Sequence, residues 1–76
     1  MLKLIIIGKR ADILPFRAVG AELVEINDDS KAGSAIESLK NSEESLMVMM
    51  TEDLAGLCQK EITEFRQKKT NMFIFR

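Results

Sequence analysis

The chain has 76 residues, with 11 basic and 12 acidic side chains and a formal net charge of -1. A hydrophobic content of 46% with so little net charge is typical of one small globular domain, residues 1–76, and excludes a disordered chain. The missing basic excess argues against a nucleic-acid binder. With no histidine and one cysteine, the sequence supports neither a disulfide framework nor a zinc-finger site.

The longest uninterrupted apolar runs, residues 4–7 and 46–50, are too short to cross a bilayer. The amino-terminal segment shows no small-residue cleavage site after its apolar run, so it does not resemble a signal peptide. We therefore expect a cytoplasmic protein without direct membrane insertion.

Four apolar runs predict β-strands at residues 2–7, 23–26, 45–50 and 71–75. The first run is almost continuously apolar, which is typical of a strand covered on both faces in a parallel sheet. The second run is broken by Glu25 and fits an edge strand or a half-exposed strand. In the last run Phe73 and Phe75 face one side, and Met72 and Ile74 the other. If this strand lies at an edge, one of these pairs is only partly covered.

Three helices are expected between the strands. Asp12 is a plausible cap for a helix over residues 12–20, with Pro15 in its first turn and Gly20 at its end. A second helix is expected at about residues 30–40. Thr51 can cap the third, whose apolar stripe comprises Leu54, Leu57, Cys58, Ile62 and Phe65.

Strands and helices thus alternate along the chain as βαβαβαβ. This order is typical of an α/β fold with a parallel sheet, and right-handed crossovers place helices on both faces. The sequence predicts a four-stranded, doubly wound domain.

Ligands of such folds gather beyond the carboxyl ends of the strands. Three polar clusters fall there, at residues 8–12, 27–30 and 51–53. The first has the single glycine Gly8, whereas dinucleotide and P-loop sites need several glycines and, for a P-loop, a hydroxyl residue after the lysine. Asp28 and Asp29 are better explained as the start of a helix than as a metal site.

Two further catalytic interpretations also lack essential groups. A phosphoacceptor receiver domain needs an aspartate at the end of its third strand, where this sequence has Thr51. Cys58 is the only thiol, and no histidine is available to activate it. We therefore predict no catalytic residues, no metal and no cofactor.

Two segments resemble the F subunit of V-type and A-type rotary ATPases. Residues 7–12 followed by 15–20 are similar to the family's first turn and the helix after it, which carries a phenylalanine-arginine pair, here Phe16 and Arg17. Residues 51–55 resemble its threonine-glutamate segment, here Thr51 and Glu52. The order and spacing of these segments agree over almost the whole chain.

The resemblance implies a non-catalytic subunit of the central stalk, peripheral to the membrane. Its partners would be the D subunit, which forms the coiled coil of the rotor, and neighbouring ATPase subunits. It would couple or regulate ATP hydrolysis or synthesis with proton or sodium transport. Phe16, Arg17, Thr51 and Glu52 are the partner-binding residues that the resemblance implies. The alternative is a receiver-like signalling or scaffold domain that binds another protein.

The sequence departs from the family pattern in two places. Lys9 stands where an acidic residue is common in the first turn. The sequence also ends after the fourth strand, whereas family members continue into a C-terminal helix that packs along the coiled coil of the rotor. One side of the last strand is therefore expected to lack its usual cover.

Overall fold

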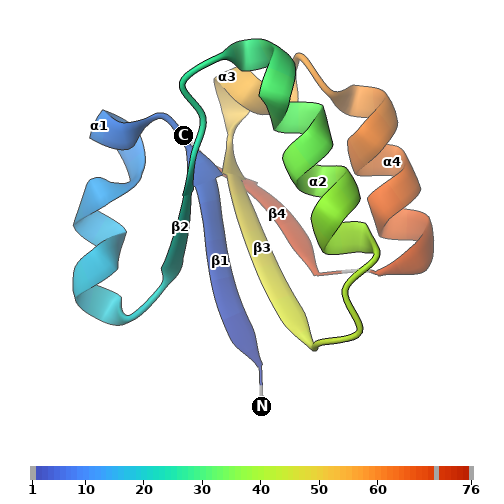
Figure 1. Ribbon diagram of the computed structural model, residues 1–76, viewed down its shortest axis with the longest axis horizontal. Helices are drawn as coiled ribbons and strands as arrows, with labels where there is room; N and C mark the ends of the chain where they lie inside the picture. The colour runs from blue at the N-terminus through green and yellow to red at the C-terminus, as the bar shows by residue number, and fades with distance from the viewer. Residues whose placement is uncertain (1, 70, 76) are drawn as a thin grey trace.

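Four parallel strands form one sheet in the order β2-β1-β3-β4 (Figure 1). The computed structural model describes residues 2–69 and 71–75 of the chain. The strands are β1 (Lys3–Gly8), β2 (Glu22–Glu25), β3 (Leu46–Thr51) and β4 (Met72–Phe75). All four predicted strands are confirmed, and β2 and β4 are the edges.

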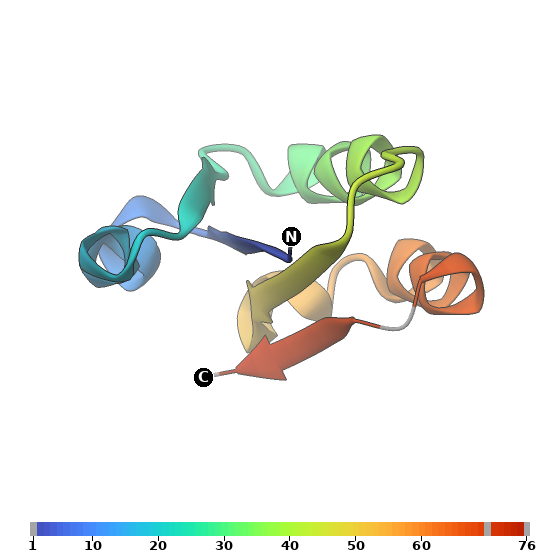
Figure 2. The same ribbon diagram turned by 90° about the horizontal axis from the view of Figure 1, so that it is seen from below.

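Helices lie on both faces of the sheet (Figure 2). The helices α2 (Ala32–Lys40) and α4 (Gln59–Lys68) lie side by side on one face. The short α1 (Arg10–Ile13) and the 3-10 helix η1 (Leu14–Val19) lie on the opposite face, against β1 and β2. The prediction of a doubly wound α/β fold is confirmed.

The main core fills the space between the sheet and the α2–α4 pair. Alternate residues of β1 and β3 point into it, because successive side chains of a strand face opposite sides. Its buried members are Ile5, Ile7, Ile26, Ala32, Ile36, Leu46, Val48, Met50, Leu54, Ala55, Cys58, Ile62, Phe65 and Met72. We call this side of the sheet the closed face.

The first helix differs from the prediction at its start and in its type. It begins at Arg10, so Asp12 lies inside α1 and does not cap it. Pro15 has no N–H group to continue the α-helical hydrogen bonds, and the chain tightens into η1 at Leu14. Gly20 ends the segment with φ at 83°, as predicted from its position.

The expected third helix is divided into two. The first part is α3 (Glu52–Ala55), and α4 follows after Gly56, Leu57 and Cys58. In this turn the N–H groups of residues 57 and 58 bond to carbonyls three residues earlier, which shifts the phase of the apolar stripe. Leu57 is therefore 61% exposed, and its expected place on the buried stripe was wrong.

The start of the second helical segment agrees with the sequence. A 3-10 turn, η2 (Asp29–Lys31), leads directly into α2. The Asp28 carboxylate accepts hydrogen bonds from the Ser30 backbone N–H at 3.0 Å and from the Ser30 hydroxyl at 2.9 Å.

Among the described residues, no helix has the length and apolar character that crossing a membrane requires.

Candidate functional site

One side of the β3–β4 half of the sheet carries apolar side chains that no helix of residues 2–69 covers. The side chains on it alternate with those of the closed face, and α1 and η1 lie over β1 and β2 instead (Figure 2). Phe73 is 49% exposed. We call this surface the open face, and its residues are Leu4, Met47, Met49, Phe73 and Phe75.

Phe16 marks the border of the open face. Its ring meets that of Phe75 edge to face, with the two centroids 5.4 Å apart and the ring planes at 74°. Phe16 is half-buried by this contact, while Arg17, the next residue of η1, is exposed. Of the phenylalanine-arginine pair, the structure thus brings only Phe16 to the open face.

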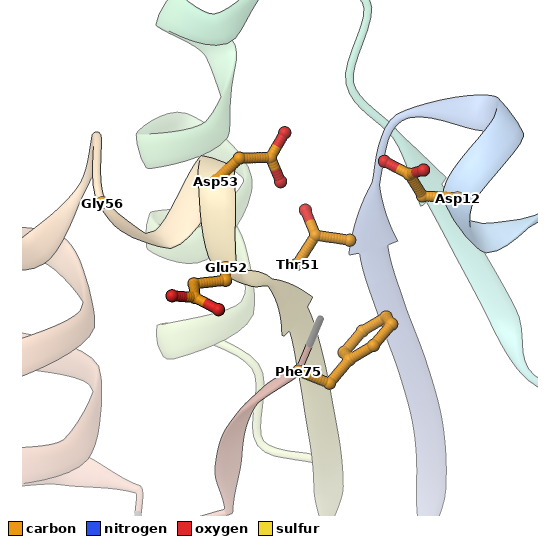
Figure 3. A pocket seen from close by; sticks show the side chains of 6 residues that line it. All are labelled: Asp12, Thr51, Glu52, Asp53, Gly56 and Phe75. Carbon is orange, nitrogen blue, oxygen red and sulfur yellow. The ribbon is translucent and has the colours of Figure 1, made fainter.

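A pocket of about 670 Å³ lies at the carboxyl end of the sheet. It brings together α1, the end of β3, α3 and the end of β4 (Figure 3). We call it the carboxyl-end pocket, and it is lined by Asp12, Thr51, Glu52, Asp53, Gly56 and Phe75.

The pocket unites the first and third polar clusters of the sequence, through Asp12 and Asp53. The second cluster lies next to the first, because the Lys9 ammonium is 3.6 Å from the Asp29 carboxylate. The expected gathering of polar residues at the carboxyl ends is therefore confirmed. Of the predicted partner-binding residues, Thr51 and Glu52 line this pocket, whereas Arg17 does not.

Thr51 is almost fully enclosed, with 4% of its surface exposed. It stands at the N-cap position of α3, yet its side chain makes no capping hydrogen bond, so only its position was predicted correctly. Within residues 2–69 and 71–75 its buried Oγ1 atom has no hydrogen-bond partner. Buried hydroxyls are normally paired. Among the described residues, the Thr51 side chain thus differs from the other buried side chains, which are hydrophobic.

Gly8 permits the close packing beneath the pocket. A Cβ atom at this position would lie 2.5 Å from Cγ2 of Ile13 and 2.9 Å from Cγ2 of Thr51. Both distances are shorter than side-chain contacts allow. Gly8 is therefore required where β1 approaches α1 and β3, and no phosphate is needed to explain it.

The lone thiol lies in the core beneath α3 and α4. The Cys58 Sγ atom donates to the Leu54 carbonyl at 3.2 Å. Burial, followed by the nearby Glu61 carboxylate, raises the pKa of Cys58 above its ordinary value. This favours the protonated thiol, which is a poor nucleophile. Across the described ranges, no three acidic, histidine or cysteine side chains group together as metal ligands.

Three residues of this region were not recognised as site residues from the sequence. Asp12 was expected to cap a helix, Asp53 was named only as part of the polar cluster at residues 51–53, and Phe75 was expected on one side of the last strand. The position of each near a strand end was the available signal. What the sequence did not show is that all three line one pocket.

Comparison with models of known protein families assigns the chain to a family. A family model described as ATP synthase (F/14-kDa) subunit matches residues 4–75. A search of curated proteins found no match. Because the family model spans nearly the whole chain, the protein belongs to the ATP synthase (F/14-kDa) subunit family and is part of a V/A-type ATPase.

Proposed function

We propose that the chain is a non-catalytic rotor subunit in the central stalk of this ATPase, peripheral to the membrane in the cytoplasm. It binds the D subunit, the coiled coil of the rotor, together with neighbouring subunits, and it couples or regulates ATP hydrolysis or synthesis with proton or sodium transport. It acts as one globular domain, residues 1–76, without a cofactor. The observation that carries this proposal is the open face.

The open face has the properties of a surface for a partner helix. Its methionine and phenylalanine side chains are apolar, and they adjoin one another on neighbouring strands. Methionine adapts its shape to different partners, and aromatic side chains contribute strongly to binding. Contiguous exposed apolar surfaces on small proteins often mark interaction sites. A coiled coil with apolar side chains outside its own seam is complementary to such a face.

The closed face supplies the rigidity that a rotor component needs. Its large side chains, such as Phe65 and Ile36, are fully buried between the sheet and two helices. A well-packed core of this kind transmits force without yielding. Of the four partner-binding residues expected from the resemblance, Phe16 borders the open face, and Thr51 and Glu52 lie at its carboxyl end.

The test is sedimentation velocity of the full chain mixed with the coiled-coil rotor protein of the same ATPase. We expect a one-to-one complex, and we expect Phe73→Ser to weaken it by about ten-fold or more, because an exposed aromatic residue is lost from the centre of the contact. The matched control is Val19→Ser. Val19 is also an exposed apolar residue, at 70%, but it lies on η1 outside the open face.

Two outcomes would contradict the proposal. The first is the absence of a complex with the full chain. The second is equal affinity for the wild type and the Phe73→Ser variant, which would place the contact on another surface. Circular dichroism of each free variant checks that the fold is retained.

A further inference from the structure

The carboxyl-end pocket presents acceptor groups from two separate elements. Asp12 comes from α1 and Asp53 from α3, and their carboxylates are directed toward the same hollow (Figure 3). The Thr51 hydroxyl points into the space between them (Figure 3). Glu52, the third carboxylate of the lining, points away from the other two (Figure 3). The hollow between Asp12 and Asp53 thus combines their carboxylates with the enclosed hydroxyl of Thr51.

No basic side chain of the described chain satisfies these groups. Neither carboxylate, Asp12 or Asp53, forms a hydrogen bond or ion pair with another described residue. Lys9, the basic residue before α1, is held by Asp29 on the other side. The Thr51 Oγ1 atom has no partner in the part of the chain that the structure describes. Among the described residues, the lining of the pocket contains no group with several hydrogen-bond donors and a positive charge.

The pocket and the open face are continuous, because Phe75 belongs to both. One side of this junction is apolar and the other is acidic. A partner that covers the open face therefore meets the two carboxylates at its edge, next to an aromatic ring. A cation near an aromatic ring is stabilised by the ring's electrons, and carboxylates add charge complementarity.

We propose that the carboxyl-end pocket receives an arginine side chain of the helix that covers the open face. The guanidinium has five N–H donors in a planar fork, so it can reach acceptors that lie apart, here Asp12 and Asp53. Its flat face packs on Phe75, and the hydroxyl of Thr51 is a further acceptor at the enclosed end. This inference rests on the proposed function and specifies how the partner is recognised.

A divalent cation is a poorer occupant of the same pocket. A metal ion needs several ligands within about 2.0–2.6 Å. The carboxylates that line this hollow of about 670 Å³ do not converge on one point, since the described residues contain no group of three side chains that could hold a metal ion.

The test measures the affinity of the full chain for the coiled-coil rotor protein with Asp12→Asn and Asp53→Asn, singly and together. Each variant removes one charge and keeps the size of the side chain. We expect the double variant to bind about ten-fold or more weakly and to show a smaller dependence on salt. Glu43→Gln is the control, because it removes one charge from the loop before β3, at the opposite end of the sheet.

A charge exchange identifies the arginine. Asp53→Arg is combined with replacement of each arginine of the coiled-coil partner by aspartate, and one pair should restore binding that each single change weakens. Equal affinity of the wild type and the double variant would overturn this inference and leave the proposed function intact. Loss of wild-type binding on addition of a chelator would also overturn it, in favour of a metal ion. If the wild type forms no complex, both proposals fail.

Discussion

The two faces of the sheet differ in what covers them. On the closed face, α2 and α4 bury side chains from β1, β3 and β4, and Phe65 is completely enclosed. On the other face, α1 and η1 cover only β1 and β2, which leaves Phe73 half-exposed on β4. The same strands therefore support a stabilising core on one side and an available apolar surface on the other.

This difference separates stability from binding. Side chains on the closed face are removed from water on folding, and each contributes to the free energy of unfolding. Side chains on the open face stay partly in contact with water in the free chain. They contribute to the free energy of binding when a partner covers them. Substitutions on the two faces should therefore affect different measurements.

The largest expected contrast is between two phenylalanine residues. Phe65→Ala should lower the free energy of unfolding by about 3–5 kcal/mol, because it leaves a cavity in the closed face. Phe73→Ala should lower it by less than about 1 kcal/mol, because its side chain is half-exposed. Urea unfolding of both variants measures the two losses. Equal losses would show that the open face is packed in the free chain, and the two faces would then not differ in their contribution to stability.

A second substitution tests the packing of β1 beneath α1, on the same side of the sheet as the open face. Gly8→Ala should destabilise the chain by about 1–3 kcal/mol, because its Cβ atom would collide with Ile13 and Thr51. Gly56→Ala is the matched control, since its φ is -62° and its Cβ atom would meet only ordinary contacts, the nearest at 3.7 Å. Thermal unfolding compares the two. A harmless Gly8→Ala change would show that this corner is loosely packed and closer in character to the open face.

The smallest expected effect concerns the surface, outside both faces. Hydrogen bonds from the Ser30 N–H and then from its hydroxyl lower the pKa of Asp28 below its ordinary value of 3.8. The carboxylate is therefore favoured by folding. Its contribution to stability is present above the unfolded pKa and is lost as the pH falls through the lower, folded pKa.

Asp28→Asn keeps an acceptor for the same cap but removes the titrating charge. We expect the variant to lose slightly less stability than the wild type when the pH is lowered from neutrality to below 3.8, measured by thermal unfolding. Glu43→Gln, at the other end of the sheet, controls for the change in net charge. An identical pH dependence for the wild type and Asp28→Asn would mean that the Ser30 contacts do not favour the charged form.

The order of the strands and helices could be predicted because the apolar runs are short and separated by clear turn residues. Local choices within helices could not. At Pro15 and Gly56 the α-helical and 3-10 turns differ by one hydrogen-bond step, and nearby packing decides between them. The contact of Phe16 with Phe75 joins the start of the chain to its last strand, and no local pattern encodes it. The general tendency of ligand sites to lie at the carboxyl ends of parallel strands located the polar clusters correctly. It did not predict which of their side chains line one pocket.

The position of β1 makes the two helical layers depend on each other. Ile5 and Ile7 of this strand face the closed face, while Ile6 between them is completely buried on the side of α1. One short strand thus belongs to both layers, and loosening either layer exposes part of it. Unfolding should consequently be cooperative, with both layers lost in a single transition. An ATPase subunit built this way unfolds as one unit, without a state in which only one layer is lost.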